Sequence, residues 1–155
     1  MYLDTSALFK RYVREPGSTS LDHLFLKADH GQLTLVFSAW NIGEVIGALD
    51  ERHQSKRFTN AEYSSAIFNF SEETLRMVRT GLVRIIPVAG KLLTISWQIL
   101  QQAHIYEADA LQIASCKEEA CDIMLTEDRR LLQAAQKEGL NSLDPAKDEK
   151  HLLSL

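Results

Sequence analysis

Short apolar segments alternate with longer segments of helical periodicity along the chain. The short segments have the length of strands, and several are rich in β-branched residues. They are MYL (1–3), LTLVFSA (33–39), LVRIIPV (82–88), IMLT (123–126) and LNSL (140–143). We predict a strand at each of these segments, the last one at an edge of a sheet.

Between the strands, apolar residues recur every three or four positions, which predicts helices. The first helix, ALFKRYV, is broken by Pro16-Gly17, and the second ends at Gly31. The sequence Thr59-Asn60-Ala61-Glu62 fits a capping box that begins a long helix. Apolar spacing predicts the other helices within 42–49, 92–103, 107–116 and 129–139.

Strands that alternate with helices favour an α/β fold. We predict a three-layer α/β/α sandwich, in which helices cover both faces of a central parallel sheet. No internal repeat or low-complexity linker divides the chain. We therefore expect one domain over residues 1–146 and a polar C-terminal tail over residues 147–155 that frays, apart from its terminal leucines.

The composition is that of an ordinary globular protein, with 45% apolar and 25% charged residues among 155. The net charge of −4 argues against nucleic-acid binding through bulk positive charge but leaves room for a local basic patch. Charged residues interrupt any signal peptide near the start, and no run of about 18 apolar residues occurs. We expect a cytoplasmic protein without a membrane partner.

The two cysteines, Cys116 and Cys121, lack the CxxC spacing of a zinc site, and the five histidines are scattered. Two cysteines are also too few for a disulfide scaffold. We interpret both as buried or half-buried thiols.

Acidic residues stand at the ends of the predicted strands, where the functional crevice of an open α/β sheet lies. Asp4 follows MYL, Asp128 lies two residues past IMLT, and Glu44 is in the first turns of the helix after LTLVFSA. Asp109 is in the first turn of the helix that precedes IMLT. Helix capping, helix dipoles or solvation would explain the first three singly. Asp109 is harder to explain, because its helix is small and apolar nearly all round.

Four carboxylates on one rim would repel each other, and some would take up protons unless a cation joined them. Mg²⁺ prefers oxygen ligands and binds through one or two carboxylates plus waters. Such an ion, or a pair of ions, activates water and stabilises the oxygens of an in-line phosphoryl displacement. The pattern therefore predicts a site for a divalent metal ion.

The chain resembles the PIN-domain family over almost its whole length. MYLDTSALFKRYVREPGS is similar to the family's opening strand and D-T/S-S motif, and SAWNIGEV to its glutamate helix. EADALQIAS is similar to its D-A-L-x-x-A segment, and MLTEDRRLLQAAQKEGL to its T-x-D-x-x-L closing block. Within the family, the resemblance is strongest to VapC-type toxins of toxin–antitoxin pairs.

The resemblance implies a metal-dependent ribonuclease with a parallel sheet in the order 3-2-1-4-5. The family's acidic quartet falls on Asp4, Glu44, Asp109 and Asp128. Asp4, Asp109 and Asp128 would hold Mg²⁺ or Mn²⁺, and Glu44 would bind the metal through water or help to deprotonate the attacking water. The resemblance also implies that hydroxyl groups support the carboxylates, at Thr5, Ser6 and Thr126.

Basic residues near the acids are candidates for contact with RNA phosphates. They are Lys10, Arg11 and Arg14 after the first strand, and Arg129 and Arg130 after the fourth. Ordinary surface charge is the alternative explanation, and the two arginines beside Asp128 are the better placed to meet phosphate. The resemblance further implies a homodimer and a small antitoxin protein as partners.

Two other functions compete with the nuclease. A phospho-acceptor receiver domain also gathers acids at strand ends, but it needs adjacent acids after its first strand and a lysine after its fifth. Here one aspartate is followed by Thr-Ser, and no lysine fits the last strand. A PIN-like module that binds RNA or protein without cleaving it is the second alternative.

Overall fold

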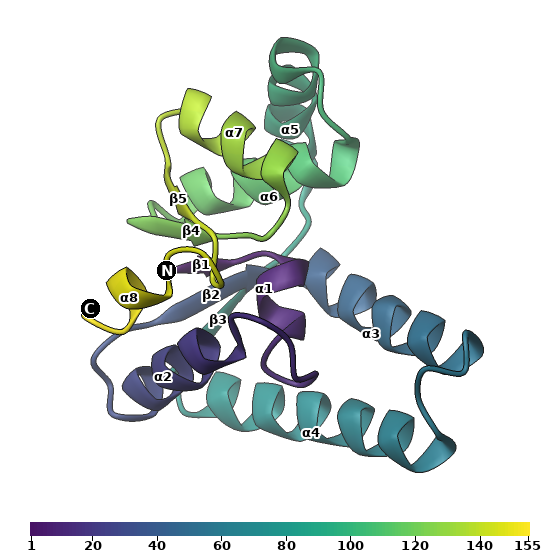
Figure 1. Cartoon of the computed structure of the whole chain (residues 1–155). Helices are drawn as coiled ribbons and strands as arrows, with labels where there is room; N and C mark the ends of the chain where they lie inside the picture. Colours follow the sequence, from purple (N-terminus) through teal and green to yellow (C-terminus); the bar gives the residue numbers. More distant parts are fainter.

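A computed structural model describes residues 1–155, and its centre is a parallel sheet of five strands in the order β3-β2-β1-β4-β5 (Figure 1). Their bounds are Tyr2–Leu3 for β1, Leu35–Ser38 for β2, Val83–Ile86 for β3, Ile123–Leu125 for β4 and Asn141–Leu143 for β5. In the central register, Tyr2 lies between Val36 on one side and Met124 on the other. The predicted strand order is confirmed.

Eight helices connect or follow the strands. They are α1 (Thr5–Phe9), α2 (Ser18–Asp29), α3 (Ala39–Gln54), α4 (Asn60–Arg79), α5 (Gly90–Ala103), α6 (Glu107–Glu118), α7 (Arg129–Lys137) and α8 (Glu149–Leu152). The capping box predicted at the start of α4 is present, because Thr59 and Glu62 bond to each other's backbone N–H groups. β2 is shorter than predicted because Ser38 caps α3, which begins at Ala39.

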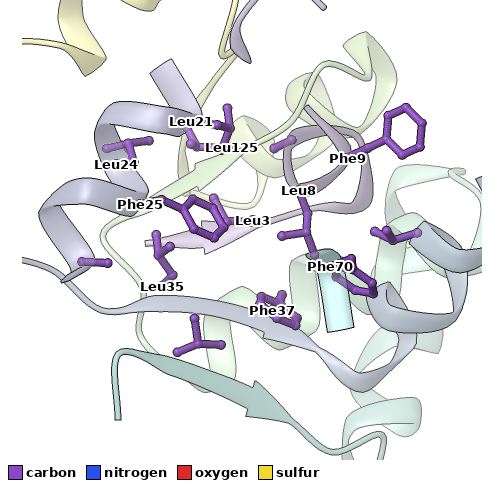
Figure 2. Close-up of a cluster of buried hydrophobic side chains, with 14 of the residues drawn as sticks. Leu3, Leu8, Phe9, Leu21, Leu24, Phe25, Leu35, Phe37, Phe70 and Leu125 are labelled. Atoms are coloured by element: carbon purple, nitrogen blue, oxygen red, sulfur yellow. The ribbon is translucent and has the colours of Figure 1, made fainter. Parts of the chain in front are cut away.

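Successive side chains in each strand point to opposite faces, and this divides the apolar residues into two cores. Leu3, Leu35 and Leu125 pack with residues of α1 to α4 and with α8 (Figure 2). Tyr2, Val36 and Met124 pack on the other face with residues of α5, α6 and α7. The sheet is therefore covered on both faces, as the predicted α/β/α sandwich requires.

The C-terminal tail, which we expected to fray apart from its terminal leucines, contains a short helix. Residues 149–152 form α8, and Leu152 is buried in the core beside α2. The connection to α8 is also fixed, since the Ser20 hydroxyl donates to the Pro145 carbonyl at 2.7 Å. Gly17 lies so close to Pro145 and Ala146 that a side chain there would meet their backbone. The buried Leu152 thus holds α8 against the domain.

None of the helices is both long and apolar enough to cross a membrane.

Phe70 and Phe68 test how α4 covers the sheet. Phe70 is 1% exposed and makes an edge contact with Tyr12, whereas Phe68, two residues earlier on the same helix, is 63% exposed. We expect Phe70→Ala to lower the free energy of unfolding by about 3 to 5 kcal/mol, because it leaves a cavity in the core. Urea unfolding monitored by circular dichroism measures this change.

The matched variant Phe68→Ala removes the same atoms at an exposed position. It should change the free energy of unfolding by about 0.5 kcal/mol or less. Equal losses in the two variants would contradict this placement of α4.

Candidate active site

A depression of about 310 Å³ lies at the carboxyl edge of the sheet and is lined by acidic side chains. Asp4, Glu44, Asp109 and Asp128, which the sequence analysis singled out, all line it. They come from the end of β1, from α3, from α6 and from the start of α7. The parallel strand order brings these four segments, distant in sequence, to one edge.

Asp4 is the most buried of the four, with 4% of its surface exposed. One carboxylate oxygen accepts hydrogen bonds from the Ala7 N–H and the Ser6 hydroxyl, both at 2.8 Å. The other accepts from the Thr126 hydroxyl at 2.7 Å. Burial nevertheless raises the pKa of Asp4 to about 6, and the negative charge of Glu44 contributes to the increase. Asp4 thus caps α1 and also faces the depression.

The negative charges of Asp109 and Asp128, which both line the depression, repel each other. Burial, with the charges of Asp128 and Glu44, raises the pKa of Asp109 to about 6. Asp128 caps α7, with one oxygen accepting from the N–H groups of Arg130 at 2.6 Å and Leu131 at 3.1 Å. The site therefore concentrates negative charge beyond what its own hydrogen bonds offset.

The three predicted hydroxyl residues all bond to elements of the site. Thr126 donates to Asp4 and accepts from the Asp128 N–H at 3.0 Å. Ser6 donates to Asp4 and accepts from the Glu127 N–H at 2.8 Å. Thr5 donates to the Glu44 carboxylate.

Behind Glu44 lies a buried network of polar side chains that the sequence analysis missed. The Gln112 amide donates to Glu44 at 3.0 Å, and its oxygen accepts from the Tyr2 hydroxyl at 2.9 Å and the Asn41 amide at 2.8 Å. The Asn41 amide also donates to Thr5 at 2.9 Å. Helical spacing holds a signal for both amides, because Asn41 precedes Glu44 by three residues and Gln112 follows Asp109 by three.

The oxygen-rich lining fits a hard divalent cation. All four acids of the quartet offer carboxylate oxygens, and no histidine or cysteine lines the depression. As the side chains lie, no three acidic, histidine or cysteine groups enclose a common point at metal distance. Mg²⁺ is usually held by only one or two carboxylates and several waters, so the lining suits a largely hydrated ion rather than a closed cage.

The five basic residues named from the sequence occupy different environments. Lys10 is 1% exposed, and its Nζ lies 2.5 Å from Glu127 and 3.5 Å from Glu15, both of which line the depression. It neutralises part of the site from within and does not reach the surface as an RNA contact would require. Arg11 and Arg14 pair with Asp22.

Arg129 and Arg130 are exposed and stand directly after Asp128. They lie in the first turn of α7, beside the acidic depression that Asp128 and Leu131 line.

A larger depression of about 590 Å³ lies between Arg11 and α4. Its charges are already matched, because Arg11 pairs with Glu73 and Arg76 pairs with Asp29. The smaller acidic depression, where like charges converge, is the better candidate for chemistry.

Comparisons with known proteins agree with this fold. The family model described as PIN domain matches residues 1–137. Three solved structures are similar: FitAB bound to an IR36 DNA fragment, PAE2754 from Pyrobaculum aerophilum, and FitAcB from Neisseria gonorrhoeae. No curated protein sequence matches the chain.

FitAB superposes with a TM-score of 0.67 at 19% identity, covering 93% of this chain and 94% of that chain. PAE2754 gives 0.65 at 16% identity, covering 99% and 95%. FitAcB gives 0.61 at 21% identity, covering 93% and 96%. At these identities the likeness establishes a common fold over nearly the whole of each chain.

Replacing Asp109 tests the repulsion within the site. We expect Asp109→Asn to raise the melting temperature of metal-free protein at neutral pH by about 2 to 4 °C, since it removes a charge that burial and two neighbouring acids oppose. Because the folded-state pKa is raised, the gain should shrink as the pH falls from 7 to 4 and the wild-type carboxyl takes up its proton.

Differential scanning calorimetry in EDTA provides the measurement, with Asp122→Asn as control. Asp122 is exposed and lies outside the depression. A lower melting temperature for Asp109→Asn would show that Asp109 makes a favourable contact in the metal-free protein.

Replacing Gln112 tests the network behind Glu44. We expect Gln112→Leu to lower the free energy of unfolding by about 2 kcal/mol or more, because buried groups of Tyr2, Asn41 and Glu44 lose a partner. Chemical denaturation measures the loss, and the same change at the exposed Gln98 of α5 is the control. Unchanged stability of Gln112→Leu would contradict the network.

Proposed function

Since this chain belongs to the PIN-domain family, whose members are generally nucleases, we propose that it is a metal-dependent endoribonuclease. The observation that carries the proposal is the convergence of Asp4, Glu44, Asp109 and Asp128 on one depression at the carboxyl edge of the sheet. Carboxylates that repel each other favour a bound cation, and a cation beside a cleft supports phosphodiester hydrolysis.

In this proposal Asp4, Asp109 and Asp128 would hold Mg²⁺ or Mn²⁺. When bound, the ion supplies Lewis acidity that lowers the pKa of water and offsets charge on the phosphate. Asp4 is suited to a fixed ligand, because Ser6, Ala7 and Thr126 orient its carboxylate.

Glu44 would bind the metal through water or accept the proton of the attacking water. One of its carboxylate oxygens is held by Thr5 and Gln112. Its orientation is therefore fixed by groups that do not themselves need to touch RNA. Such fixed geometry is what general-base catalysis requires.

The substrate in this proposal is single-stranded or looped RNA. Unstacked nucleotides can enter a narrow crevice, whereas a duplex keeps its bases stacked and paired inside a wide cylinder. Arg129 and Arg130 are exposed beside Asp128 and would contact phosphates that flank the cleaved bond. They supply local positive charge on an otherwise acidic chain.

The resemblance to VapC-type toxins extends the proposal to partners. We propose a small antitoxin protein that covers the acidic depression, and a homodimer as the form in solution. The structural likeness to FitAB and FitAcB supports this extension at the level of the common fold.

A cleavage assay tests the proposed activity. Wild-type protein should cut a labelled total RNA pool into discrete fragments with Mg²⁺ or Mn²⁺ and not with EDTA. Asp128→Asn should slow cleavage by at least about 100-fold, because it removes a charged ligand of the reacting site. Asparagine caps helices as well as aspartate does, so α7 should keep its start.

Asp122→Asn should cleave at the wild-type rate, and a DNA pool of matched sequence should distinguish RNA from DNA specificity. Cleavage in EDTA or wild-type rates for Asp128→Asn would contradict the proposal. Intact RNA with folded, metal-loaded protein would instead favour a module that binds without cleaving.

A further inference from the structure

The two cysteines lie at the C-terminal end of α6 and in the turn before β4. This turn is at the amino end of β4, whereas the acidic depression lies at the carboxyl edge of the sheet. The Cys121 N–H donates to the Cys116 carbonyl at 3.1 Å, and the Ala120 N–H donates to the Lys117 carbonyl at 3.1 Å. Ala120 has a φ of 46°, in the left-handed region. These are the two hydrogen bonds and the backbone twist of a Schellman motif, which brings the first and last side chains of the motif together.

The motif sets a limit on the separation of the cysteines. Because the hydrogen bond joins backbone groups of the two cysteines themselves, their Cα atoms stand no more than about 7 Å apart. Disulfides typically span Cα separations of about 4.4 to 6.8 Å, which this limit approaches. Both side chains also pack in the same apolar cluster as Met124 and Leu131.

The two thiols differ in access and acidity. Cys116 is fully buried, whereas Cys121 is half-buried and open to a small reagent. The neighbouring Cys116 thiol lowers the pKa of Cys121, and the neighbouring Cys121 thiol, together with burial, raises the pKa of Cys116. Cys121 therefore has the thiolate character of an attacking cysteine, and Cys116 stands in the position of a resolving cysteine.

A metal ion does not explain the pair. Structural zinc needs four ligands, and no group of three histidine, cysteine or acidic side chains gathers around these thiols. The pairing of these two residues at the helix end thus points to chemistry between the two sulfurs.

We propose that Cys116 and Cys121 form a reversible dithiol–disulfide site whose oxidant is a small-molecule disulfide of the glutathione class. The Cys121 thiolate attacks one sulfur of that disulfide and expels a thiolate, which leaves a mixed disulfide on Cys121. Cys116 then attacks the Cys121 sulfur, and its proton passes to the second small thiolate as that thiolate departs. Two protein thiols are oxidised, and one small disulfide is reduced to two thiols.

The bond would brace the scaffold of the acidic site without entering it. It would join the end of α6, which carries Asp109 and Gln112, to the turn before β4, which leads to Thr126 and Asp128. Oxidation should therefore raise the melting temperature by restricting the unfolded chain.

Reaction of the reduced full-length protein with oxidised glutathione tests the proposal. Intact-mass analysis should show loss of two hydrogens without an adduct, and peptide mapping should find Cys116 joined to Cys121. In Cys116→Ser, one glutathione adduct should accumulate on Cys121. In Cys121→Ser, the buried Cys116 should stay unmodified.

The wild-type measurement decides the matter even if a cysteine variant fails to fold. A stable glutathione adduct on wild-type protein, disulfide-linked dimers on a non-reducing gel, or two thiols that remain free to alkylate would each overturn the proposal. Reversal by dithiothreitol, together with a lower melting temperature after reduction, would support it.

Discussion

The acidic depression depends on holding like charges together, and much of the surrounding structure can be understood from that constraint. The pKa values of Asp4 and Asp109 are both raised to about 6, mainly by burial and further by the acids nearby. Ionisation of these carboxylates at neutral pH therefore lowers the free energy of unfolding. A fold can sustain such a cost only if the surrounding cores are well packed, and two apolar cores flank the sheet here. A divalent cation would turn the repulsion into attraction, and this is why we infer one.

The constraint is met through the alternation of side chains along β1. Leu3 points into one core, while Tyr2 points to the other face, where its hydroxyl bonds to Asn41 and Gln112. These two amides extend to Thr5 and to the Glu44 carboxylate, so the network links strand, helices and site. Buried polar groups that are fully paired make an arrangement specific, because any shift would leave partners unsatisfied. The short strands thus position the acids through side chains as well as through backbone order.

Apolar periodicity was sufficient for the strands and for the segments that carry the acids, because it is a local signal, whereas the strand order followed from the resemblance to the PIN-domain family. The sequence was insufficient where a residue behaves against its type. Lys10 was expected at the surface, and lysine is rarely fully buried, yet Glu15 and Glu127 hold it inside. Leu152 secures a segment whose polar composition indicated fraying. Asn41 and Gln112 were overlooked because buried amides are recognised only by their partners, which lie on other elements.

Binding of Mn²⁺ is the most direct test that the four carboxylates act as one cation site. Electron paramagnetic resonance of free Mn²⁺ gives the number of ions bound and their affinity at neutral pH. We expect saturable binding by the wild type, weakened by at least about tenfold in Asp109→Asn and unchanged in Asp122→Asn. Equal binding by wild type and Asp109→Asn would show that the acids meet at this edge for reasons other than a metal, and it would contradict the account.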